Sequence, residues 1–130
     1  MIEHEYKKRH IKLWRDIVDY LHYVKRGEVK IYYENIAELK YALLHKQNEN
    51  SGVVFTGIYN DCYACEFALI ENGNNIDMCV KCPLINKLGC ICNDKDSGAY
   101  ALVAKAYVSQ DYEKAIRLAI KIRDAWREVK

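Results

Sequence analysis

The sequence lacks several features that would mark a membrane or secreted protein. It contains a single proline, Pro83, and no apolar run that approaches the roughly 18 residues needed to span a bilayer. Its start, MIEHEYKKRHIKLW, carries charges throughout and has no apolar segment of the signal-peptide type. We therefore expect a cytoplasmic protein without a membrane span.

Common signals of catalysis are missing as well. The chain has no Walker loop, no Gly-x-Ser-x-Gly and no Gly-x-Gly-x-x-Gly fingerprint. All four histidines lie at or before His45, and the His-x-Glu motif of zinc deaminases is absent. We therefore expect a protein that is not an enzyme.

The chain does have a sizeable apolar fraction. Hydrophobic residues make up 51% of its 130 residues, which is enough for the core of a single domain. Eleven residues are tyrosines, so much of the apolar surface carries a hydroxyl group that needs a hydrogen-bond partner or water.

All six cysteines lie between residues 62 and 92, and four of them form two Cys-x-x-Cys pairs separated by thirteen residues. Two such turns supply the four thiolates that a structural zinc prefers. In a reducing cytosol this spacing favours metal over disulfides. We predict one structural Zn²⁺ per chain, bound by Cys62, Cys65, Cys79 and Cys82.

Other arrangements of the thiols stay open. Cys90 follows Cys82 by a seven-residue loop and could replace one of the four ligands. Cys92 lies too close to Cys90 for both to bind one ion, so we expect a free thiol there. Buried reduced cysteines, disulfides and an iron–sulfur cluster are the alternatives to zinc.

The apolar pattern predicts a mainly α fold. We expect a helix over residues 3–25 that ends at Gly27, and a second helix capped by Asn35 that runs to about Lys46. Between them, residues 29–33 are β-prone and predict a short strand or an extended connector. The expected buried residues of the two helices are Trp14, Ile17, Val18, Leu21, Val24, Ile36, Leu39 and Leu43.

The rest of the chain divides into a cysteine-rich part and a helical part. Residues 53–59 predict a strand or extended lead-in, and the turn-rich residues 72–75 predict a short β-hairpin between the cysteine pairs. Helices over 100–108 and from Asp111 to the chain end predict a helical hairpin. The expected buried stripe of the last helix is Ala115, Leu118, Ala119, Ile122, Trp126 and Val129.

These elements give one domain in three parts. Residues 1–50 form the N-terminal helices, residues 51–98 an inserted zinc-knuckle module with its hairpin, and residues 99–130 the C-terminal helical hairpin. Their net charges are +2, −3 and +3. Four thiolates around one Zn²⁺ would lower the charge of the middle part to about −5, which disfavours phosphate binding by the knuckle itself.

The first half of the first helix is strongly basic. This pattern is typical of a solvated helix face, and its more specific interpretation is a contact surface for an acidic partner. The residues concerned are Lys7, Lys8, Arg9, Lys12 and Arg15.

Several segments together resemble a family of small cysteine-containing proteins encoded by tailed bacteriophages. The segments are HIKLW at 10–14, CYACEF at 62–67, CVKCPL at 79–84, GC at 89–90 and IRDAW at 122–126. The resemblance implies a phage or prophage origin and a metal-stapled helical protein in the bacterial cytosol. It also implies that Cys90 belongs with the four predicted ligands as a family-type cysteine. Residues 27–59 depart from the family pattern, and the resemblance implies no particular activity.

Three functions follow as hypotheses. The leading one is a non-enzymatic interaction protein that binds a host protein for takeover or counter-defence. The second is nucleic-acid binding by the basic helices, and the third is a sponge that sequesters a nucleotide immune signal. The oligomeric state is open, and the sponge hypothesis would suit a homodimer.

The zinc assignment predicts a sharp difference between cysteines. We expect Cys62→Ser or Cys82→Ser to lose the metal and unfold the module, since structural zinc in small sites contributes roughly 10 kcal/mol of apparent binding free energy. Cys92→Ser should be near neutral. Native mass spectrometry and thermal melting check both results, and a Cys62→Ser protein that keeps its metal and melting temperature would show the ligand assignment to be wrong.

Overall fold

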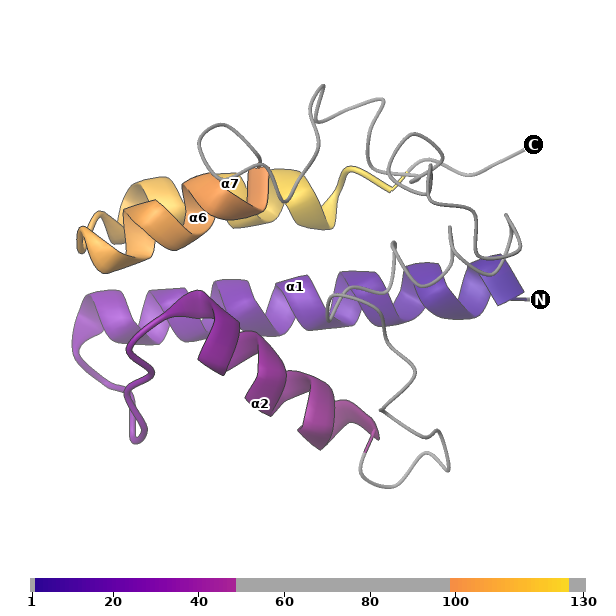
Figure 1. Cartoon of the computed structure of the whole chain (residues 1–130), viewed down its shortest axis with the longest axis horizontal. Helices are drawn as coiled ribbons and strands as arrows, with labels where there is room; N and C mark the ends of the chain where they lie inside the picture. Colours follow the sequence, from indigo (N-terminus) through magenta and orange to yellow (C-terminus); the bar gives the residue numbers. More distant parts are fainter. Residues whose placement is uncertain (1, 49–98, 127–130) are drawn as a thin grey trace.

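The computed structural model describes residues 2–48 and 99–126, and these residues form four helices. They are α1 (Ile2–Arg26), α2 (Ile36–Asn48), α6 (Ala99–Val108) and α7 (Tyr112–Arg123). In Figure 1, α6 and α7 lie side by side along α1, and α2 begins beside α1 and slants away from it towards its other end. The predicted mainly helical class is confirmed for this part of the chain, while the cysteines and the predicted β elements at 53–59 and around 72–75 lie outside it. Among the described helices, none has the length and apolar character of a membrane span.

The first helix forms as its pattern predicts and ends in a Schellman motif. Its stripe of buried residues recurs every three or four positions, so one face enters the core. Gly27 takes a φ of 72°, and its N–H donates to Val24 O at 3.0 Å. Glu28 N–H donates to Tyr23 O at 2.9 Å, which completes the motif. The predicted stripe is confirmed and is joined by one further apolar residue, Leu13.

Helix α2 begins where predicted but turns a different row of residues inward. Asn35 Oδ1 accepts a hydrogen bond from Glu38 N–H at 2.9 Å, which confirms the N-cap. Ile36 and Leu39 are buried, but Leu43 is only half-buried and Leu44 is fully buried in its place. The reason is that α2 packs against α6 as well as α1. This contact turns the row that contains Lys40 inward, with Lys40 Nζ lying 4.6 Å from the ring centre of Tyr100 on α6.

The predicted helical hairpin is confirmed in α6 and α7. Its turn passes through Gln110, whose φ is 62°, a value that non-glycine residues seldom adopt. Asp111 caps α7, because its carboxylate Oδ1 accepts from Lys114 N–H at 3.2 Å. Within the predicted buried stripe, Leu118 is only half-buried and Ile116 is buried instead, while Val129 lies outside the described residues.

The prediction that the last helix continues to the chain end is wrong, since α7 ends at Arg123. In a continuing helix, Ile122 O would accept from the N–H of residue 126. Here it accepts from Ala125 N–H at 3.2 Å and lies 2.9 Å from Nε2 of His10 on α1. Trp126 is still buried, as the stripe predicts, but a turn carries it there.

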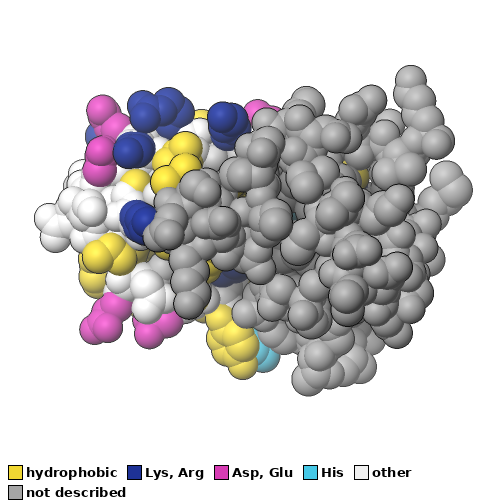
Figure 2. All heavy atoms as spheres, turned by 45° about the horizontal axis from the view of Figure 1, so that its top comes forward, with side chains coloured by type: hydrophobic (Ala, Val, Ile, Leu, Met, Phe, Trp, Pro, Cys, Tyr) yellow, Lys and Arg dark blue, Asp and Glu magenta, His cyan; other side chains and the backbone are white. Residues whose placement is uncertain are grey.

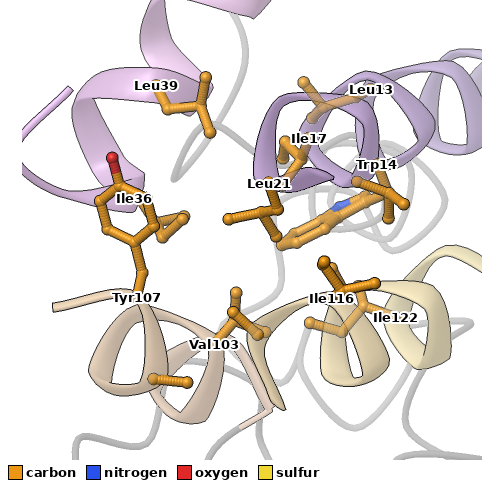
Figure 3. Packing of buried hydrophobic residues seen from close by; sticks show 14 of the residues in the cluster. Leu13, Trp14, Ile17, Leu21, Ile36, Leu39, Val103, Tyr107, Ile116 and Ile122 are labelled. Carbon is orange, nitrogen blue, oxygen red and sulfur yellow. The ribbon is translucent and has the colours of Figure 1, made fainter. Parts of the chain in front are cut away.

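The core is built from residues of all four helices. Figure 3 shows side chains of α1 and α2 meeting those of α6 and α7 across a common centre. The members that are at most 1% exposed are Leu13, Ile17, Leu21, Ile36, Leu39, Leu44, Val103, Tyr107, Ala115, Ala119 and Ala125. Burial of the leucine, isoleucine and valine side chains contributes roughly 1.5–3 kcal/mol each, before conformational entropy is counted.

His10 is the polar residue that ties α1 to the end of α7. Its side chain is only 1% exposed, and its ring lies 5.5 Å from that of Trp126. Because a carbonyl can only accept, Nε2 carries the proton in the 2.9 Å hydrogen bond to Ile122 O. This bond satisfies a carbonyl at the helix end, where intrahelical donors run out.

We expect His10→Ala to lower the free energy of unfolding by about 2–3 kcal/mol, because it removes a buried donor and the packing against Trp126. His22→Ala is the matched control, since His22 is exposed on the same helix, and it should change the free energy by less than about 0.5 kcal/mol. Urea denaturation followed by circular dichroism measures both. Equal midpoints for the two variants would contradict a structural role for His10.

Candidate interaction surfaces

The cysteines predicted as zinc ligands, Cys62, Cys65, Cys79 and Cys82 with Cys90 as the alternate, all lie outside the described residues. Within residues 2–48 and 99–126, no group of three or more metal-binding side chains comes together. The surfaces that the structure describes are those of the four helices and of the connector between α1 and α2.

Three of the five predicted basic residues share one exposed face of α1. Lys8, Lys12 and Arg15 are exposed, and their spacing places them on neighbouring turns of the helix. Ile11 lies among them and is itself 37% exposed. We call these four residues the basic face. It combines an apolar side chain with three surrounding cations.

The other two predicted residues do not join this face. Lys7 and Arg9 are half-buried and lie on its flanks. Within the basic face, Lys12 Nζ lies 3.6 Å from Asp16 Oδ2, one turn further along α1. An exposed pair of this kind is worth little, so Lys12 remains available to a partner. In the described part of the chain, Lys8 and Arg15 form no ion pair.

Sequence reasoning missed a cluster of tyrosines that holds the connector, residues 27–35. Tyr20 Oη on α1 accepts from Tyr33 N–H at 2.9 Å and donates to Ile31 O at 3.2 Å. Tyr107 Oη on α6 donates to Tyr33 O. Each hydroxyl has one proton and gives it to a connector carbonyl, so the 3.4 Å contact between the two hydroxyl oxygens is an alternative to these bonds.

The rings of the cluster pack as well as their hydroxyls. Tyr32 stacks on Tyr107, with ring centres 6.1 Å apart and planes 22° apart, and Tyr112 meets Tyr107 edge-on at 5.9 Å. Tyr20 and Tyr33 lie 5.6 Å apart. Such aromatic pairs add roughly 0.5–1.5 kcal/mol each beyond area burial. The cluster therefore fixes the connector against α1 and the helical hairpin.

Burial raises the pKa of two phenols of this cluster, those of Tyr107 and Tyr112. Burial raises the pKa of Tyr107 well above its usual value of 10.0, and the neighbouring hydroxyl of Tyr20 raises it further. Burial also raises the pKa of Tyr112, followed by its hydrogen bond with Tyr32. The native cluster therefore holds these phenols neutral well into alkaline pH.

The outer side of the connector exposes apolar side chains. Ile31 is 63% exposed, Tyr32 55% and Val108, at the end of α6, 66%. With Tyr23 near the end of α1, they make up four of the six large hydrophobic residues that are exposed in the described part of the chain. We call these four the connector surface. Figure 1 shows that the end of α1, the start of the connector and the turn of the hairpin lie at one end of the bundle.

Two cations near the connector surface are paired within the chain. Lys25 Nζ lies 2.8 Å from Glu113 Oε1, and Arg26 Nε lies 3.2 Å from Glu28 Oε2. The first pair joins α1 to α7 and lowers the pKa of Glu113, through the hydrogen bond first and the charge of Lys25 second. Figure 2 shows cationic, anionic and hydrophobic side chains interspersed on the described end of the molecule. This end therefore has no strong field of one sign.

Comparison of the chain with models of protein families, with curated proteins and with solved structures found no match. The features that bear on function are therefore the two surfaces, one basic and one apolar, and the predicted metal site.

The tyrosine cluster predicts a distinctive pH dependence. We expect Tyr107→Phe to lower the free energy of unfolding by about 1–2 kcal/mol near neutral pH, since Tyr33 O loses its donor. Because the folded pKa of Tyr107 is raised, its contribution is fully present below about pH 10 and is lost as the pH rises above that value. The gap between parent and variant should therefore narrow above pH 10.

Denaturation in urea from pH 7 to pH 11 measures this gap. Tyr23→Phe is the control, because Tyr23 is exposed and its ring can still lie beneath Arg26 after the change. A gap between parent and Tyr107→Phe that stays constant or widens above pH 10 would refute the assigned role of the hydroxyl.

Proposed function

We propose that this protein is a non-enzymatic interaction protein that binds an acidic surface of a host protein through the basic face of α1. The observation that carries the proposal is the exposed Ile11 among Lys8, Lys12 and Arg15. An apolar anchor supplies binding energy when it is buried in a complex, and the surrounding cations supply electrostatic steering and orientation.

The proposed zinc would serve this role structurally. Cys62, Cys65, Cys79 and Cys82 lie between α2 and α6 in the sequence, so one Zn²⁺ bound there would staple the segment that joins them. A closed set of four thiolates leaves no open position for substrate, which supports a binding role over catalysis. The resemblance to phage proteins supports a bacterial cytosolic setting, in which host takeover or counter-defence is the proposed purpose.

Nucleic-acid binding is the second candidate, and the same three cations favour it. Its weakness is the neighbouring acidic residues, since Asp16 pairs with Lys12 and Asp19 is exposed on the same helix. A helix that mixes both signs repels phosphate at some positions while attracting it at others. An acidic protein surface can place its carboxylates opposite the cations and away from the acidic residues. The regularly spaced phosphates of a nucleic acid cannot be arranged in this way.

The test begins with a photo-crosslinking amino acid at Ile11 in bacterial host cells, followed by identification of the attached molecule. We then expect Lys8→Glu/Arg15→Glu to weaken binding of the purified partner by about a hundredfold, and Ile11→Ser by about tenfold. Lys114→Glu/Lys121→Glu is the matched control, because it makes the same charge change on exposed positions of α7. It should leave affinity within about threefold.

Calorimetry at two salt concentrations separates the candidates. Crosslinks to RNA or DNA, with an affinity that falls steeply with salt, would replace the protein-binding proposal by the nucleic-acid one. Equal losses for the α1 and α7 variants would show that net charge matters and the basic face does not.

A further inference from the structure

The connector surface is a second site that host binding through α1 does not use. Residues 8–15 lie in the first half of α1, whereas the connector begins after its end, and Figure 1 places these parts at opposite halves of the helix. At a rise of about 1.5 Å per residue, the distance from Ile11 to the end of α1 is more than 20 Å. A partner on the connector surface therefore leaves the basic face accessible.

The exposed side of the connector has a symmetric charge pattern. Lys30 and Glu34 are both exposed, carry opposite charges and each lie two residues from Tyr32. Within the described residues, neither of them forms an ion pair. The nearby cations Lys25 and Arg26 are already paired with acidic residues of the same chain. The unpaired charges are thus one of each sign, placed evenly about an exposed tyrosine.

We propose that a second copy of this chain binds the connector surface, with the two connectors antiparallel about Tyr32. A two-fold axis near Tyr32 places Lys30 of each copy opposite Glu34 of the other, so both pairs form at once. The exposed side chains of Ile31, Tyr32 and Val108 are then buried between the copies.

The charge pattern and the ordered connector both favour a second copy of the chain as the occupant. A polyanion such as nucleic acid would meet Glu34 and two ion pairs that already neutralise Lys25 and Arg26. A second copy instead offers a Glu34 for each Lys30 and a Lys30 for each Glu34, because a two-fold interface brings the same surface of both copies together. The hydroxyls of Tyr20 and Tyr107 also hold the connector in place, so little conformational entropy is lost on association.

Tyr32 is the expected centre of the interface. One face of its ring lies against Tyr107, and the residue as a whole remains 55% exposed. Stacking of the two Tyr32 rings across the axis would continue the aromatic column from one copy into the other. The resulting dimer would present two basic faces, and a partner with two acidic sites would bind it with increased avidity.

A charge swap tests this arrangement in the full-length chain. We expect Lys30→Glu and Glu34→Lys each to raise the dimer dissociation constant by about tenfold, since each change puts like charges opposite each other twice. The double variant Lys30→Glu/Glu34→Lys should return to within about threefold of the parent. An equimolar mixture of the two single variants should associate as well, because their connectors are complementary.

Sedimentation velocity over a range of concentrations measures these constants. Lys121→Glu on α7 and Asp19→Lys on α1 are matched controls, since they make the same charge changes at exposed positions elsewhere. The proposal is overturned if the parent chain sediments only as a monomer, or if the double variant associates as weakly as the single ones. It is also overturned if the α7 and α1 controls weaken association as much as the connector variants do.

A photo-crosslinking amino acid at Tyr32 supplies an independent result. We expect a product of twice the chain mass whose crosslink maps to the connector of the other copy, and no such product from the same amino acid at Tyr41, which is exposed on α2. A crosslink from position 32 to a different protein would assign the connector surface to that protein instead. Since the basic face is not altered in these experiments, their failure leaves the proposed host binding to its own test.

Discussion

The packing of α1 against α7 is the interaction on which the described fold depends. Two side-chain contacts fix its register and direction: His10 meets Ile122 near one end, and Lys25 meets Glu113 near the other. Because low numbers on α1 pair with high numbers on α7, the helices run antiparallel. The buried contact at His10 contributes more than the exposed ion pair, which solvent screens. Helix α6 packs against α7, to which a short turn joins it. Helix α2 covers the core by packing against both α1 and α6.

Local signals in the sequence predicted the helices well. Gly27, Asn35 and Asp111 act through residues a few positions away, so their roles as helix boundaries could be inferred without knowing the fold. The apolar stripe of α1 was predicted for the same reason, since its 3.6-residue period is a local property.

The errors arise where distant parts of the chain meet. Leu44 replaces Leu43 in the core because α6 lies against α2, and α7 ends early because His10 reaches its last turn. The tyrosine cluster joins residues 87 positions apart, from Tyr20 to Tyr107. Composition indicated that many hydroxyls needed partners, but only the fold shows that their partners are the carbonyls of Tyr33 and Ile31.

The candidate sites, too, were predicted from the sequence only where they depend on local signals. The basic residues were predicted as a group from their number, but helix geometry separates them: Lys8, Lys12 and Arg15 share a face with Ile11, while Lys7 and Arg9 do not. The connector surface had no sequence signal beyond β-prone residues, because exposure depends on the packing of α1 and α6 around it. The zinc prediction, by contrast, depends on the spacing of the cysteines alone and does not depend on how the helices pack.

The contact between His10 and Ile122 has a consequence for how the chain folds. These residues are 112 positions apart, so the helices that carry them must find each other across nearly the whole chain. Closing so long a loop is entropically costly, and chains dominated by such contacts fold slowly. The hairpin of α6 and α7, whose helices are joined by a short turn, closes its own contacts far more readily. We therefore expect this hairpin to form early and α1 to dock onto it late, which makes the arrival of α1 the step that sets the folding rate.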